Sequence, residues 1–146
     1  MIHWNNLSEQ QRTDLWRQER EKIGNLNYID RLSSLSIFFS HVPFGSRTID
    51  FYTPDNWLTP WEILHYGLFC RSSISLLMFH TLTIVDPEIN IKLCLIDDKE
   101  DIFLVPIVDD TFVLNYIPGE VIKASKLKKS VKIQQTFTKE QIKTFA

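Results

Sequence analysis

The hydrophobic pattern of this 146-residue chain changes its period at Asp86-Pro87, and this change constrains the fold more than any other sequence feature. Before that point, apolar residues recur at helical spacing, most clearly in residues 70–82. After it, residues 88–96 alternate with a period of two, which is typical of a half-buried β-strand. A helical half followed by an antiparallel half predicts an α+β fold, with helices packed on one face of a small antiparallel sheet.

Capping and turn residues divide the two halves into individual elements. We expect helices over residues 8–23, 28–39, 60–66 and 70–82, with a short extended piece at 48–52. We expect strands over residues 88–96, 102–108 and 111–116 and a further strand around Val131 and Ile133. Residues 138–145 are expected to form a short terminal helix or a frayed end. Together they predict one domain, 1–146, with N-terminal helices (1–45), a core (49–121) and a basic extension (122–146).

Composition excludes several classes of protein. A hydrophobic fraction of 44% predicts a packed globule, and a net charge of −2 gives no global nucleic-acid signature. No apolar run reaches the length of a membrane span, and the first residues do not resemble a signal peptide. Cys70 and Cys94 are too few for a disulfide framework. We therefore expect a cytoplasmic protein without membrane attachment.

The segment before Cys70 carries the strongest local signals. Thr59 and Glu62 have the spacing of a capping box around Pro60, and Gly67 is a natural helix stop. Cys70 then falls in the first turn of the next helix, where the helix dipole favours a thiolate. Catalysis by such a thiol also needs a base, and His65 is the candidate nearest in sequence.

This segment resembles the transglutaminase-like cysteine peptidase superfamily, especially its bacterial branch. The matching residues are Trp57, Thr59, Pro60, Glu62, Leu64, Gly67 and Cys70. The resemblance covers residues 49–121, about half of the chain, and implies a transglutaminase-like (papain-like) core. It also implies that Cys70 is the nucleophile position and Asn115 the position of the residue that orients the catalytic histidine.

The departures from the family pattern affect the catalytic residues. Phe69 replaces the family's aspartate, Arg71-Ser72 replaces an acidic pair, and the histidine position falls at or near Ile102. We therefore expect a degenerate, non-catalytic protein-binding or structural module. The alternative is an active thiol hydrolase or acyltransferase in which Cys70 attacks, Asn115 orients and His65 is the base, with the Cys70 amide holding the oxyanion.

Aromatic residues ahead of Cys70 are the candidate binding residues. In a peptidase-like fold, Phe51, Tyr52, Trp57 and Trp61 would wall the cleft, whereas in an ordinary domain they would belong to the core. If they are exposed, they indicate a protein partner. We expect a protein partner and predict no oligomeric state.

Metal, cofactor and nucleic-acid sites are not predicted. The histidines and cysteines lack metal-ligand spacing, and the acidic run at 97–101 reads as a solvated turn. Five lysines at 123–132 are suited to phosphate contacts, but the missing aromatic residues argue against nucleic acid, and lysines also protect edge strands. A fainter resemblance to uncharacterised proteins of tailed cyanophages implies a phage origin, and with it the host cytoplasm or the virion as the location.

Overall fold

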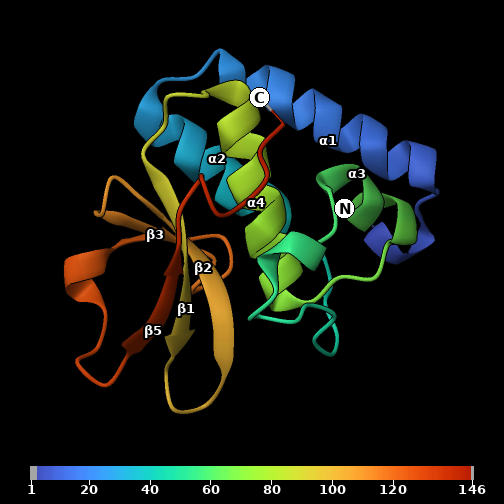
Figure 1. Cartoon of the computed structure of the whole chain (residues 1–146). Helices are drawn as coiled ribbons and strands as arrows, with labels where there is room; N and C mark the ends of the chain where they lie inside the picture. Colours follow the sequence, from blue (N-terminus) through green and yellow to red (C-terminus); the bar gives the residue numbers. More distant parts are fainter. Residues whose placement is uncertain (1–2, 146) are drawn as a thin grey trace.

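Four α-helices precede five β-strands in the computed structural model, which describes residues 3–145, and the helices cover one face of the sheet (Figure 1). The helices are α1 (Glu9–Gly24), α2 (Tyr28–Ser40), α3 (Pro60–Tyr66) and α4 (Arg71–Val85). The strands are β1 (Ile91–Asp97), β2 (Ile102–Val108), β3 (Phe112–Leu114), β4 (Val121–Lys123) and β5 (Lys132–Phe137). This arrangement confirms the predicted α+β class. None of the described helices is both long and apolar enough to cross a membrane.

The helix ends form where the sequence places capping residues. Ser8 and Thr59 each make a reciprocal capping box, before α1 and α3 respectively. Gly67 ends α3 in the left-handed conformation, with φ 66°. Arg12 of α1 then holds the end of α3, because its guanidinium donates to the carbonyl oxygens of Leu64 (2.7 Å) and His65 (2.9 Å). These contacts fix the turn that leads into Cys70.

The sheet is antiparallel, with the strand order β4-β3-β2-β1-β5. The central hairpin pairs Ile91 with Val108 and Asp97 with Ile102. The last strand, β5, returns to the free side of β1, so β4 and β5 form opposite edges of the sheet. A register shift interrupts the β1–β5 pairing between Leu95 and Ile96.

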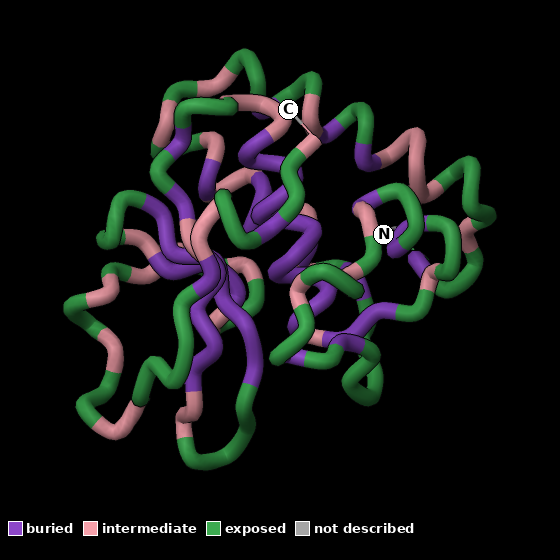
Figure 2. Tube along the Cα trace, in the orientation of Figure 1, coloured by how far each residue is buried: buried purple, intermediate pink, exposed green. Residues whose placement is uncertain are grey.

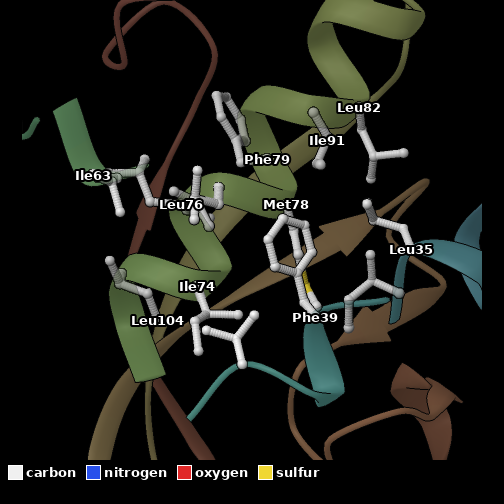
Figure 3. Packing of buried hydrophobic residues seen from close by; sticks show 14 of the residues in the cluster. Leu35, Phe39, Ile63, Ile74, Leu76, Met78, Phe79, Leu82, Ile91 and Leu104 are labelled. Atoms are coloured by element: carbon white, nitrogen blue, oxygen red, sulfur yellow. The ribbon is translucent and has the colours of Figure 1, made fainter. Parts of the chain in front are cut away.

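Helix α4 is the centre of the larger core. It is buried from Ser72 to Thr83, which Figure 2 shows as a nearly continuous buried stretch. In Figure 3, its side chains meet Leu35 and Phe39 of α2 and Leu104 of β2. The cluster extends from Trp4 to Ile142, so all three segments of the predicted domain contribute to it. The division at residues 45, 49 and 121 stays a prediction.

The sheet is buried on both faces, so the prediction of a half-buried first strand is wrong. A second cluster, containing Cys94, Ile96 and Phe103, lies on the face away from α4. The chain between β3 and β5 covers this face with Leu127 and Val131, among others. Alternation along β1 therefore separates two cores rather than a core and solvent.

Several predicted elements differ from the structure. Residues 48–52 are irregular rather than extended, and residues 138–145 form a turn and a strap rather than a helix. Strand β3 ends early because Asn115 adopts φ 60° and turns the chain away. Strand β4 was not predicted, since three residues are too few to show alternation.

Candidate functional site

A cleft of about 740 Å³ opens between the loop that follows α2 and the turn that joins β1 to β2. Residues 44–47, Phe51 and Tyr52 form one wall, and the β1–β2 turn with Ile102 forms the other. Cys70 and Arg71, at the start of α4, also line it. The predicted nucleophile position therefore lies at this cleft.

Cys70 is the N-cap residue of α4 rather than a residue of its first turn. Its Sγ accepts a hydrogen bond from the Ser73 amide at 3.3 Å, and its own amide donates to Ser73 Oγ at 2.9 Å. These two bonds form a capping box in which sulfur takes the place usually held by oxygen. The expectation that the Cys70 amide holds an oxyanion is therefore wrong for this conformation, because Ser73 already occupies that donor.

The Cys70 thiol is both shielded and polarised. It is only 2% exposed, and the Thr48 hydroxyl donates to its Sγ at 3.3 Å. Burial raises the pKa of the Cys70 thiol, but hydrogen bonds from Thr48 and Ser73 outweigh burial, so the pKa lies below its ordinary value. These two hydrogen bonds therefore favour the charged form of Cys70 over that of a thiol that is buried without donors.

The position expected for the catalytic histidine holds Ile102, which lines the cleft. None of the described histidines lines the cleft. His65, the proposed replacement base, has its Nδ1 2.7 Å from Glu9 Oε1 of α1, so the structure pairs it with Glu9 and not with Cys70. His80 is buried in α4 beside Phe145, at a separate cavity.

Asn115, the predicted orienting residue, contacts α4 rather than a histidine. It is buried, and its Nδ2 donates to the Arg71 carbonyl at 3.0 Å and to Ser75 Oγ at 2.8 Å. Ser75 Oγ in turn donates to the Leu104 carbonyl at 2.6 Å. Asn115 therefore links the turn after β3 to the first turn of α4, and Ser75 links that turn to β2.

Arg71 is a cleft residue whose role was not anticipated from the sequence. Its guanidinium lies 3.3 Å above the centre of the Phe103 ring and 3.9 Å from Asp101 Oδ2, and it donates to the Tyr116 carbonyl. Burial lowers the pKa of Arg71, although Asp101 partly opposes that shift. The sequence did mark this position, because Arg71 stands where the family has an acidic residue. It could not show that the arginine stacks on Phe103, because Phe103 lies on the distant strand β2.

The four predicted aromatic binding residues separate into two pairs. Phe51 and Tyr52 line the cleft, and Tyr52 is 64% exposed. Trp57 instead donates to the Asp50 carbonyl and packs on Phe137. The other tryptophan, Trp61, packs between Trp16 and Phe145. The prediction that both tryptophans wall this cleft is therefore wrong.

Two further cleft residues were missed by sequence reasoning. Phe44 lines the cleft and is 48% exposed, and the Arg47 guanidinium lies 4.6 Å above the Phe51 ring. No sequence motif marks this loop, which is held near Cys70 by a hydrogen bond from the Gly45 amide to the Phe69 carbonyl.

The acidic turn between β1 and β2 satisfies its own backbone. Asp98 Oδ1 accepts from the amides of Glu100 and Asp101 at 3.0 and 2.8 Å. Within residues 3–145, no group of three or more histidine, cysteine or acidic side chains is placed to hold a metal ion. The turn therefore acts as a capped hairpin tip beside the cleft.

Comparisons with known proteins address the fold of this site. The sequence matches no protein-family model and no curated protein. Among solved structures, Legionella pneumophila LapG is similar, with a TM-score of 0.73 and 15% identity over 90% of this chain and 75% of LapG. EGTA-treated LapG gives a TM-score of 0.73 and 15% identity, over 90% of this chain and 74% of that one. Calcium-bound LapG gives a TM-score of 0.70 and 16% identity, over 91% of this chain and 77% of that one. The chain thus shares the transglutaminase-like fold of LapG, which confirms the predicted architecture.

Proposed function

We propose that this chain is a non-catalytic binding module that holds a segment of a protein partner in the cleft beside Cys70. The observation that carries the proposal is the state of the site around the thiol. Ile102 occupies the position expected for the base, and the Cys70 amide is bonded to Ser73. A thiol without a base or a free oxyanion donor has lost the two groups that acyl transfer needs most.

The side chains that line the cleft indicate that it binds a partner. Phe44, Tyr52 and Ile102 all line the cleft, and each leaves more than a third of its surface exposed. Large apolar side chains gathered at one cavity of a folded domain are typical of an interaction site. Exposed apolar walls around a thiol that lacks a base favour recognition over catalysis as the use of this cleft.

The test is selection of peptide ligands from a random library, followed by variants of the cleft. We expect selected peptides to lose at least about tenfold in affinity with Tyr52→Ser, as expected for an exposed aromatic anchor. Tyr66→Ser is the matched control, because Tyr66 is 58% exposed but lies on α3 outside the cleft lining. Peptides should remain intact by mass spectrometry after long incubation.

Three results would contradict this proposal. One is a library that gives no binder, and another is a set of binders equally sensitive to Tyr52→Ser and Tyr66→Ser. The third is cleavage of the bound peptide, or an acyl adduct on Cys70, which would establish the second candidate.

The second candidate is a thiol hydrolase or acyltransferase, and the hydrogen bonds to Cys70 Sγ favour it. Thr48 and Ser73 both donate to Cys70 Sγ at the start of a helix, and such donors favour a thiolate. In this mechanism Cys70 Sγ attacks the acyl carbon and displaces an amine or alcohol, and water or another amine then releases the acyl group from the thioester. His65 would have to leave Glu9 to take the thiol proton and pass it to the leaving group. The pH dependence of iodoacetamide alkylation tests it, since a slow rate that is unchanged between about pH 6 and 9 argues against an activated thiolate.

A phage origin and a location in the host cytoplasm or virion belong to the same proposal. They rest on the fainter sequence resemblance to cyanophage proteins alone. Detection of the chain by mass spectrometry in purified virions would distinguish a virion component from a protein of the infected host.

A further inference from the structure

Residues 121–132, here called the lysine segment, cross the outer face of the sheet from one edge to the other. The segment begins in β4 and ends at the start of β5, and these strands are opposite edges of the sheet. Along the segment, Ile122, Ala124, Leu127 and Val131 pack against the outer core cluster. Figure 1 shows this part of the chain, in orange and red, on the side of the sheet away from α4.

The lysine side chains of this segment all point away from that packing. Half of the ten lysines of the chain lie within it, and the segment contains no acidic residue. All five are exposed: Lys123, Lys126, Lys128, Lys129 and Lys132. Among the described residues, none of these ammonium groups takes part in an ion pair or a side-chain hydrogen bond. Because the apolar residues between them are anchored, the charges form one outward surface.

The lysines of this segment are spread along the width of the sheet rather than gathered at one place. Five strands span four interstrand spacings, so the segment stretches over about 19 Å. Protection of edge strands accounts for Lys123 in β4 and Lys132 in β5, but the other three lie outside strands. A line of unpaired positive charge is suited to a linear polyanion.

We propose that the lysine segment binds the phosphate backbone of double-stranded nucleic acid without reading its sequence. Phosphate contacts by lysine supply the affinity of non-specific duplex binding and need no aromatic side chain. The absence of aromatic residues, which argued against nucleic acid at the sequence level, excludes stacking on single strands but not this mode. The apolar residues of the segment pack inward, which disfavours insertion into a lipid bilayer.

The test is fluorescence anisotropy of a labelled random-sequence duplex of about 20 base pairs, titrated across a range of salt concentrations. If all five lysines contact phosphates, the slope of log K against log salt is about −4.5. Affinity then falls about 500-fold between about 50 and 200 mM KCl. The triple variant Lys126→Gln, Lys128→Gln, Lys129→Gln should reduce the slope to about −1.8.

A charge-matched control separates this surface from net charge. Arg17→Gln, Lys22→Gln and Lys143→Gln remove three exposed positive charges from elsewhere on the chain and should leave the slope unchanged. Far-UV circular dichroism and urea unfolding verify that both triple variants fold. Tyr52→Ser should also leave duplex binding unchanged, so failure here is distinct from failure of the cleft proposal.

Any of four results would overturn the inference. The first is a slope of log K against log salt near zero, and the second is an equal reduction of that slope in the two triple variants. The third is tighter binding to single strands than to the duplex. The fourth is binding to phosphatidylserine vesicles without binding to the duplex. The slope of about −4.5, lost only in the lysine-segment variant, supports it.

Discussion

The stability of this protein should decrease in mild acid because of one buried histidine. His80 is 2% exposed in α4, and its Nδ1 is buried without a hydrogen-bond partner. The ring contacts Phe79 and Phe145, and the cavity beside it is lined by one acidic and one basic side chain, Asp55 and Lys143. Burial lowers the pKa of His80 to about 4.

The direction of the effect follows from proton linkage. The pKa falls from 6.5 in the unfolded chain to about 4 in the folded one, so the unfolded state binds the proton first. Above pH 6.5, His80 is neutral in both states and costs no stability. Between pH 6.5 and about 4, only the unfolded state binds the proton, so the free energy of unfolding decreases as the pH falls. The full difference is about 3 kcal/mol, and most of it is lost by about pH 4.5.

The assay is urea unfolding at about pH 7.5 and 4.5, followed by far-UV circular dichroism. His80→Phe removes the titrating group, keeps the aromatic contact with Phe145 and has room to adjust towards the neighbouring cavity of about 140 Å³. We expect the wild type to lose about 2–3 kcal/mol more than His80→Phe between these pH values. Other titrating groups cancel in this comparison, and His41→Phe, at an exposed position, should behave as the wild type.

Two outcomes would refute the reasoning. If the wild type and His80→Phe lose the same free energy between the two pH values, His80 is not held neutral by burial. If His41→Phe removes the acid sensitivity as well, the effect belongs to the general histidine content rather than to the His80 environment.

Three other predictions concern the neighbourhood of Cys70. Thr48→Val should raise the pKa of the Cys70 thiol, because it removes the hydroxyl donor to Sγ, and an unchanged midpoint of the alkylation rate against pH would contradict this. Gly67→Ala should destabilise the fold by at least about 1 kcal/mol in urea unfolding. The added Cβ meets both a positive φ of 66° and the Arg12 Cζ at 2.8 Å, so an unchanged midpoint would show that Arg12 moves freely. Ile102→His should place an imidazole in the cleft and increase the iodoacetamide rate of Cys70 above pH 6.5, and an unchanged rate would remove Ile102 from the base position.

Local chemistry was sufficient to predict the helices and the hairpin of this fold. The spacing of Ser8 with Gln11 and of Thr59 with Glu62 encodes capping boxes, and both are present. Gly67 ended α3 because a left-handed residue was needed there. These features depend on neighbours within four residues, so a single sequence contains what is needed to recognise them.

The predicted roles of Asn115 and His65 depend on contacts between elements that are distant in the sequence. Asn115 was assigned to a histidine, but its partners are Arg71 and Ser75 on α4. The sequence proximity of His65 suggests it as the base for Cys70, but its ring pairs with Glu9 of α1. Ion pairs and side-chain hydrogen bonds over such separations follow from packing, which alternation and capping patterns do not specify.

Substitution of Cys70 by serine separates a residue kept for structure from one kept for reactivity. Serine is a better N-cap than cysteine, and its Oγ has the same donors available from Thr48 and Ser73. If capping is the whole role of Cys70, Cys70→Ser changes the free energy of unfolding by less than about 1 kcal/mol and leaves peptide binding intact. Cys70→Val, which fills the site but accepts no hydrogen bond, should then cost about 1–2 kcal/mol. The opposite result is a Cys70→Ser variant that folds as well as the wild type but no longer binds the peptides. That result would show that the thiol itself is used, and it would contradict the non-catalytic proposal.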